Sequence, residues 1–314
     1  MPTEKVSPSA VIAFVFLGLI WGSNFIFVKW AAQDISPLQI TLMRVLFGFL
    51  PVMAYALLKR ELRWAHWRHA HHFVVMSLLA TALYYYAFAL GTALLPSSVA
   101  GVLSGAIPLF TFLGAALFLR GETINGTRIA GVILGFIGVL LIARPWSATG
   151  DISLAGVGYM LGGSLCVGLS FVYARRYVSP LGLPVAALTT YQIGFALLFL
   201  LAVTPMRGID ALFADTRAWV GLTLGLGLLG TGLAYIAYYF IVESLGAIAA
   251  SSVTYIPPVV ALLIGVVLAG ESTDAIALLA IVFILAGVAC LQIGGLTRRR
   301  ASTPTVDPAA RVHQ

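Results

Sequence analysis

The chain has 314 residues, of which 61% are hydrophobic and 9% are charged, and its mean hydropathy is +1.02. An ordinary soluble domain carries about 25% charged residues. This composition therefore argues against a cytosolic enzyme, a disordered protein and a secreted disulfide scaffold, and a polytopic membrane protein remains. The net charge of +7 does not indicate nucleic-acid binding, because the basic residues lie at the ends of apolar segments, where they orient a chain in the bilayer.

Ten apolar segments follow one another, each near the length of about 20 residues that a helical span needs. They cover 10–30, 37–58, 73–91, 97–119, 127–143, 152–174, 184–203, 218–242, 247–269 and 275–294. We expect an all-α integral membrane protein with ten transmembrane helices. Residues 1–9 form a short tail, and the polar residues 295–314 are expected to be disordered.

The distribution of lysine and arginine predicts the orientation. With a cytoplasmic N-terminus, the outer loops and adjoining span ends hold only Lys29, Arg144, Arg207 and Arg217, and most other basic residues lie inside. By the positive-inside rule both termini are expected in the cytoplasm, in a membrane that we take to be the bacterial inner membrane.

The two halves of the chain match each other, which predicts two five-helix repeats over 10–144 and 145–294. At nearly constant offsets, Pro108 pairs with Pro257, Gly121-Glu122 with Gly270-Glu271, Thr81 with Thr231, and Tyr85 with Tyr235. Because five spans is an odd number, the second copy must enter the membrane from the opposite side. Inverted repeats of this kind are typical of alternating-access transporters.

Several of these motifs together resemble the EamA-type repeat of the drug/metabolite transporter superfamily. The first half has Trp21-Gly22-Ser23-Asn24-Phe25, Arg44, Pro108 and Gly121-Glu122, and the second has Ser170-Phe171, Gln192, Pro257 and Gly270-Glu271. The resemblance implies a ten-helix exporter of small metabolites, often amino acids, with a central cavity between the repeats. The second half departs from the pattern, with Val167-Gly168 instead of Trp-Gly and Gln192 near the position of Arg44.

Two prolines are expected near the middle of spans four and nine. Pro108 and Pro257 each remove a backbone donor, so a neighbour or a cavity must satisfy the freed carbonyl. Their matching positions favour hinges or cavity walls, and a fixed packing kink is the alternative.

Aromatic and small polar side chains inside the spans are the candidates for substrate binding. Tyrosine and tryptophan combine a flat apolar face with a polar group that needs a partner when buried, and a buried amide or hydroxyl needs one too. The residues are Trp21, Asn24, Tyr85, Ser104, Ser164, Tyr235, Tyr238 and Tyr255. Core packing and interfacial belts are the alternative explanation for the aromatic residues.

Arg44 is the one charge clearly inside a predicted span, and an intramembrane charge indicates function by default. A structural contact to carbonyls or headgroups is the alternative. No Asp, Glu or His falls in the middle of any predicted span, so a carboxylate proton relay has no candidate beyond Glu243. Facilitated export, or coupling by groups that the sequence does not reveal, is the more economical prediction.

The leading hypothesis is an alternating-access exporter of small organic metabolites, most of all amino acids with aromatic or bulky apolar side chains. Broad efflux of drugs or toxicants is the second hypothesis, and an intramembrane enzyme built on Ser104 is a remote third. We expect no enzymatic activity and no cofactor. We also expect no metal site, since His66, His69, His71 and His72 lie in a basic loop that suits contact with anionic lipid. The expected partners are a small-molecule substrate and the lipid bilayer, with no nucleic acid and with one subunit sufficient for transport.

Overall fold

A computed structural model of the protein describes residues 7–119, 124–145 and 152–301. The first half comprises α1 (Pro8–Ala31), α2 (Pro37–Leu58), η1 (Trp64–His69), α3 (Ala70–Ser77), η2 (Leu78–Ala82), α4 (Leu83–Leu94), α5 (Ser97–Leu103), η3 (Ser104–Ala106), α6 (Ile107–Phe118) and α7 (Gly126–Ala143). The second comprises α8 (Leu154–Tyr173), η4 (Ala174–Val178), η5 (Ser179–Leu181), α9 (Val185–Val203), η6 (Ile209–Ala214), α10 (Thr216–Val220), η7 (Gly221–Leu233), α11 (Ala234–Ser252), η8 (Val253–Tyr255), α12 (Ile256–Ala269) and α13 (Ala275–Ala301).

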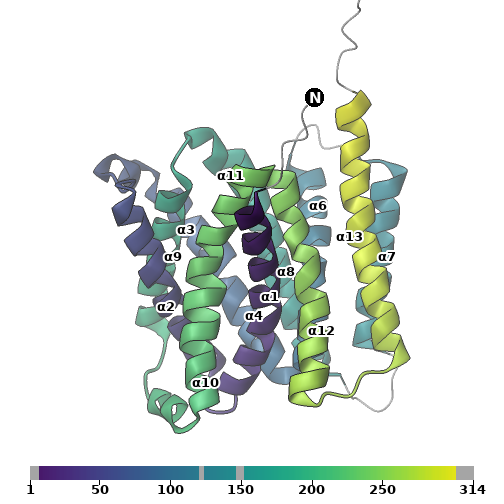
Figure 1. Ribbon diagram of the computed structural model, residues 1–314, viewed down its shortest axis with the longest axis horizontal. Helices are drawn as coiled ribbons and strands as arrows, with labels where there is room; N and C mark the ends of the chain where they lie inside the picture. The colour runs from purple at the N-terminus through teal and green to yellow at the C-terminus, as the bar shows by residue number, and fades with distance from the viewer. Residues whose placement is uncertain (1–6, 120–123, 146–151, 302–314) are drawn as a thin grey trace, which may run out of the picture.

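The described part of the chain forms ten helical spans, as predicted. Nine are long and apolar enough to cross a membrane, and the tenth is the shorter apolar helix over Val253–Ala269. The spans run side by side, and the start of α1 and the end of α13 lie on the same face of the bundle (Figure 1). The protein is thus an all-α membrane protein, and no strand occurs in residues 7–119, 124–145 or 152–301.

Local sequence signals explain where several spans begin. Ser36 and Gln39 form a reciprocal capping box in front of α2, with Pro37 in its first turn. At the start of α7 and α8, side-chain oxygens of Asn125 and Ser153 accept backbone N–H bonds from the first turn. These caps satisfy donors that the helix itself leaves unpaired.

Two boundaries differ from the sequence prediction. The break expected at 243–246 is helical, because α11 continues to Ser252 through the stretch Ala247–Ala250. That stretch contains three alanines, the strongest helix former, and the next proline along the chain is Pro257. Likewise α13 continues to Ala301, past the predicted start of the tail at 295, and residues 302–314 lie outside the described part.

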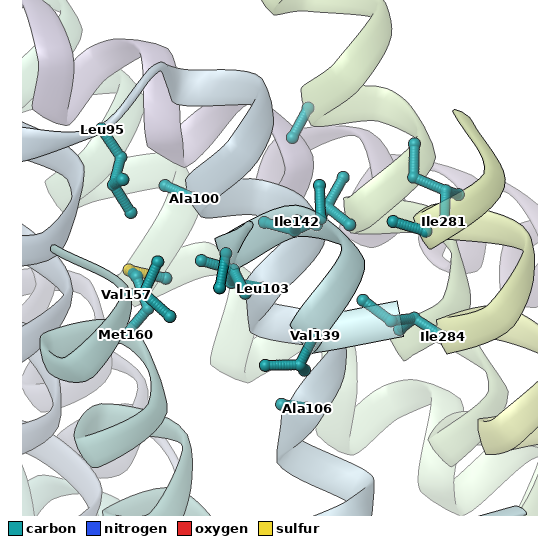
Figure 2. Packing of buried hydrophobic residues seen from close by; sticks show 14 of the residues in the cluster. Leu95, Ala100, Leu103, Ala106, Val139, Ile142, Val157, Met160, Ile281 and Ile284 are labelled. Atoms are coloured by element: carbon teal, nitrogen blue, oxygen red, sulfur yellow. The ribbon is translucent and has the colours of Figure 1, made fainter. Parts of the chain in front are cut away.

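The largest hydrophobic core joins α5, η3, α7, α8 and α13. Figure 2 shows Leu103 and Ala106 facing Val139 and Ile142 of α7 and Ile284 of α13. Small residues let α7 and α13 approach closely: a Cβ on Gly131 would lie 2.7 Å from the carbonyl oxygen of Gly287. Close packing of this kind drives helix association in a bilayer, because an apolar side chain gains little free energy when it exchanges lipid contacts for protein contacts.

The outward face of the bundle is apolar. Leu117, Leu198 and Val267 are 78%, 64% and 74% exposed, and many other large hydrophobic side chains are exposed around the bundle. In water this surface would aggregate, whereas in hydrocarbon it is the favourable one. The polar residues described next are, in contrast, buried inside.

Candidate functional site

Two hydrogen bonds join the halves of the chain through matching residues. The Nε–H of Arg44 donates to Oγ1 of Thr231 at 2.9 Å, and the Nε2–H of Gln192 donates to Oγ1 of Thr81 at 2.9 Å. Thr81 and Thr231 are paired by the sequence repeat, and Gln192 lies near the position that matches Arg44. Each bond therefore runs from the second span of one half to the third span of the other. All four side chains are buried.

Both threonines lie in π-helical segments. Thr81 is in η2, where the N–H of Leu83 bonds to the carbonyl of Leu78, and Thr231 is in η7, where its hydroxyl bonds to the carbonyl of Leu226 at 2.9 Å. The two segments fall on matching residues of the repeat. π-helical turns are rare and frequently occur at functional sites. The wider turn here sets Thr81 and Thr231 toward the partner half.

Arg44 is held against an aromatic face. Its guanidinium carbon lies 3.6 Å from the centroid of the Tyr85 ring, and only 6% of the residue is exposed. This is a close cation–π contact in a desolvated site. The hydroxyl of Tyr84 is a further polar neighbour of the guanidinium.

A layer of tyrosines continues from Tyr85 into the second half. The hydroxyls of Tyr85 and Tyr235 interact, and the Tyr235 and Tyr239 rings stack with centroids 6.2 Å apart. Tyr239 in turn is hydrogen-bonded to Thr189 of α9. Tyr84, Tyr235 and Tyr239 are partly buried and keep some accessible surface. Partly accessible side chains among buried polar groups are candidates for contact with a solute.

Trp21 and Asn24 of α1 lie beside this layer. The Trp21 and Tyr238 ring centroids are 6.1 Å apart. Asn24 is buried against η7, where a Cβ on Gly230 would meet its Oδ1 at 2.2 Å, and this oxygen has no hydrogen-bond partner in the described part of the chain. Gly230 directly precedes Thr231, so Asn24 and Arg44 contact adjacent residues of one segment.

Among the described residues, no hydrogen bond or ring contact joins the three other candidates to this layer. Ser104 donates to the carbonyl of Gly101 at 2.6 Å, and Tyr255 donates to the carbonyl of Val288 at 3.1 Å. Ser164 is fully buried on α8, and its hydroxyl has no partner within the described ranges. The structure therefore brings together Trp21, Asn24, Arg44, Tyr85, Tyr235 and Tyr238, and its described part shows no such contact from Ser104, Ser164 or Tyr255 to them.

The two prolines occupy equivalent local structures. Pro108 is the second residue of α6, directly after the 3-10 turn η3, and Pro257 is the second residue of α12, directly after η8. In both halves a 3-10 turn therefore separates the proline from the preceding helix. Pro108 lies in the middle of its span, whereas Pro257 lies near the start of the span Val253–Ala269.

A polar cluster lies at the face of the bundle where α4 ends and α5 begins, opposite the start of α1 and the end of α13. The Nζ of Lys29 donates to the carbonyls of Thr92, Ala93 and Leu95 at 3.4, 3.2 and 2.8 Å, at the end of α4. The sequence places Lys29 at the end of a span, and the structure shows that it caps the end of α4, where a cation is favourable.

Glu271 binds the start of the next helix. Its carboxylate accepts the N–H and Oγ–H of Ser97 at 2.6 and 2.8 Å and the N–H of Ser98 at 2.9 Å. The same loop is joined to α7 by an ion pair between Asp274 and Arg144. The loop between α12 and α13 is thus fixed to the first half of the chain. Its repeat partner, Gly121-Glu122, lies outside the described residues.

The two carboxylates of this loop are held in the ionised form. Burial alone would raise the pKa of Glu271, but the hydrogen bonds from Ser98 and Ser97 outweigh it, and the pKa lies below its usual value of 4.5. The hydrogen bond from Arg144, helped by the N–H of Ala277, lowers the pKa of Asp274.

The histidine-rich segment does not form a metal centre within the described ranges, where no cluster of three or more His, Cys, Asp or Glu could hold an ion. The His71 and His72 rings lie 4.0 Å apart, and Nδ1 of His72 is 2.8 Å from the hydroxyl of Tyr173. Trp64 beside them is 85% exposed. Cys166 and Cys290 are free cysteines.

The model of the EamA-like transporter family matches residues 8–144 and 154–293, which is nearly all of the chain. The chain belongs to the EamA-like transporter family. The helical spans and this membership together establish an integral membrane protein of a transporter family.

Relatives of this EamA-like transporter carry broad descriptions. It is 26% identical to the uncharacterized transporter YdfC of Bacillus subtilis, over 86% of each chain. It is also 26% identical to the uncharacterized inner membrane transporter YedA of Escherichia coli K12, over 90% of each chain. A crystal structure of 20% identity covers 94% of this chain and 99% of its own with a TM-score of 0.56, which shows a shared fold.

Sequence reasoning missed several polar partners in this site. Thr231 and Thr81 entered only as matching letters of the repeat, and Thr189 and Tyr239 did not enter as site residues. The available signal was their position: Thr81 and Thr231 each lie four residues before a paired tyrosine. A polar residue one helical turn from a candidate tyrosine shares its face.

Proposed function

We propose that this chain is an alternating-access exporter of small organic metabolites, most of all amino acids with aromatic or bulky apolar side chains. The observation that carries the proposal is the pair of crosswise bonds, Arg44 to Thr231 and Gln192 to Thr81. Matching residues of the two halves make equivalent bonds to each other's spans, as expected for inverted repeats that meet around one site.

Equivalent bonds are also what alternating access requires. If the two halves exchange conformations, the contacts that one half makes before the change are made by the other half after it. A layer of polar groups and tyrosines shared by both halves can remain assembled while the two faces open in turn. The substrate would be bound in this layer.

The tyrosine layer supports the choice of cargo. Tyr84, Tyr235 and Tyr239 retain accessible surface among buried polar groups. Flat faces with a few fixed polar groups are the usual lining of a site for a small amphipathic solute. We further propose that both termini are cytoplasmic in a bacterial inner membrane, that one subunit suffices, and that export is facilitated, since Glu243 of α11 is the only carboxylate within the described helical spans.

Exchange in proteoliposomes tests this function. Vesicles that contain the purified protein and unlabelled phenylalanine should accumulate external labelled phenylalanine without a pH gradient or membrane potential, and empty vesicles should not. Alanine at Tyr85, Tyr235 or Asn24 should reduce exchange by about tenfold while the folded yield is unchanged. If all three variants exchange phenylalanine as fast as the wild type does, the proposed site is refuted. An absolute requirement for a proton gradient would overturn facilitated export.

Alanine at Tyr255 is the matched control. It removes a tyrosine of the same size whose hydroxyl already bonds to Val288 outside the layer, so exchange should be retained. Orientation is tested separately, with a reporter fused after Gln314 that is active only in the cytoplasm.

A further inference from the structure

Arg44 has a charge that the described part of the chain does not balance. Its described side-chain neighbours are Thr231, Tyr84 and Tyr85, which are all neutral. Apart from Glu243 of α11, the helical spans as the structure bounds them contain neither Asp nor Glu. A buried cation without a counter-ion is costly, and in membranes such residues mark substrate or ion sites.

Arg44 keeps N–H donors for another partner in addition to those near Thr231 and the Tyr84 hydroxyl. A guanidinium has five N–H donors in a rigid fork, and its two terminal amino groups match a carboxylate in two parallel bonds. Thr231 takes the Nε–H, and the Tyr85 ring at 3.6 Å holds the plane of the group. Orientation is thus fixed by neutral neighbours, as expected of a binding group that is preorganised for an anion.

A buried acceptor without a partner among the described residues contacts the residue before Thr231. The Oδ1 of Asn24 is buried against Gly230, next to Thr231, and it has no donor among the described residues. A buried oxygen of this kind requires an N–H or O–H partner at some stage of the cycle. Arg44 therefore offers donors, and Asn24 an acceptor, against the consecutive residues Thr231 and Gly230 of η7.

We propose that Arg44 binds the carboxylate of the transported solute, and that Asn24 accepts a hydrogen bond from its ammonium group. The solute class is an α-amino acid, with its side chain against the Tyr84 and Tyr235 rings. This assignment rests on the proposed transport function and names the residues that recognise the cargo. The bound carboxylate pairs directly with the Arg44 guanidinium, while the net charge of the loaded site stays at +1 because an α-amino acid is a zwitterion.

Thermal unfolding of the purified full chain in detergent tests the assignment, because a ligand of the folded state raises the melting temperature. The probes are phenylalanine, 3-phenylpropionate, which keeps only the carboxylate, and phenylalaninamide, which keeps only the ammonium group. Leucine and leucinamide repeat the comparison without an aromatic ring. We expect amino acids to stabilise the protein most, phenylpropionate less, and the amides not at all.

Two variants assign the effect to its residues. Arg44→Gln should weaken phenylalanine binding by roughly ten- to a hundredfold, the range for a lost hydrogen bond to a charged group. Asn24→Ala should weaken phenylalanine about tenfold and leave phenylpropionate unchanged. Arg44→Lys keeps the charge without the fork, so it should bind more weakly than wild type but still prefer acids to amides. This preference keeps the test valid if Arg44→Gln folds poorly.

The assignment is overturned if amides stabilise the wild type as well as acids do, if no amino acid in the panel stabilises it, or if Arg44→Gln binds phenylalanine with unchanged affinity. A purely structural arginine would lower the melting temperature in Arg44→Gln and leave the ligand response intact. Failure of transport is separate: proteoliposomes that exchange labelled amino acids equally well with Arg44→Gln support the transporter and refute the arginine site.

Discussion

Replacing Glu271 with glutamine isolates the contact that fixes the loop between α12 and α13 to the first half. The wild-type carboxylate accepts three hydrogen bonds at 2.6–2.9 Å from Ser97 and Ser98. Glutamine keeps one oxygen and replaces the other with an amino group, which cannot accept. At least one N–H or O–H at the start of α5 then loses its partner.

The magnitude follows from those three bonds. A hydrogen bond to a charged acceptor contributes about 1.5–3 kcal/mol, and one to a neutral acceptor about 0.5–1.5 kcal/mol. Three charged bonds become at most two neutral ones, and one donor is left unpaired. Because the site is only half-buried, solvent screens part of the loss, and we expect a destabilisation of about 2 kcal/mol.

Thermal unfolding in detergent measures this loss. For a chain of a few hundred residues, about 2 kcal/mol corresponds to a fall of roughly 4–8 °C in melting temperature. Ser97→Ala is the graded control, since it removes only the hydroxyl bond and should cost about 1 kcal/mol.

The pH dependence gives a second readout. The pKa of Glu271 is lowered in the folded state, so its contribution is fully present above pH 4.5 and is lost as pH falls through the folded value. The wild type and Glu271→Gln should differ most near neutral pH and converge only below about pH 4.5. Equal melting temperatures at pH 7, or a gap that persists unchanged in acid, would refute the reasoning.

Three further predictions follow from packing and polar contacts. Gly131→Ala should destabilise the chain by about 1–3 kcal/mol, because the added methyl meets the backbone of α13, whereas Gly158→Ala, with nothing within 4 Å, should be neutral or stabilising in the same unfolding assay. Tyr255→Phe should cost about 1 kcal/mol in that assay through the lost bond to Val288 and leave amino-acid exchange unchanged; lost exchange would return Tyr255 to the site. Thr81→Val leaves the buried amide of Gln192 without its partner and should cost about 1–3 kcal/mol, while a double change with Gln192→Leu should recover part of that stability.

The spans could be predicted from sequence because their signal is local. Apolar runs of the right length, bounded by Ser36-Pro37 or Leu95-Pro96, place the helices α2 and α5 at their observed first residues. The boundary after span eight was wrong because charge and glycine at 243–246 indicated a break, while the alanines that follow favour helix.

The site could be predicted only in part. Arg44, Tyr85 and Tyr235 stand out by charge and by the repeat, and the structure brings them together. The partners of Gln192 and Lys29 depend on how distant helices pack, since Thr81 and Leu95 are 111 and 66 residues away along the chain. Residue type alone does not determine such pairings.

The matching π-helical segments η2 and η7 have a mechanical consequence. A π turn closes its hydrogen-bonded ring with one more residue than an α turn, so each of these spans contains surplus backbone near its centre. If the surplus migrates along the span, every side chain that it passes rotates by about 100° around the helix axis. A span can then turn Tyr85 or Tyr235 toward or away from the other half while its two ends stay in place.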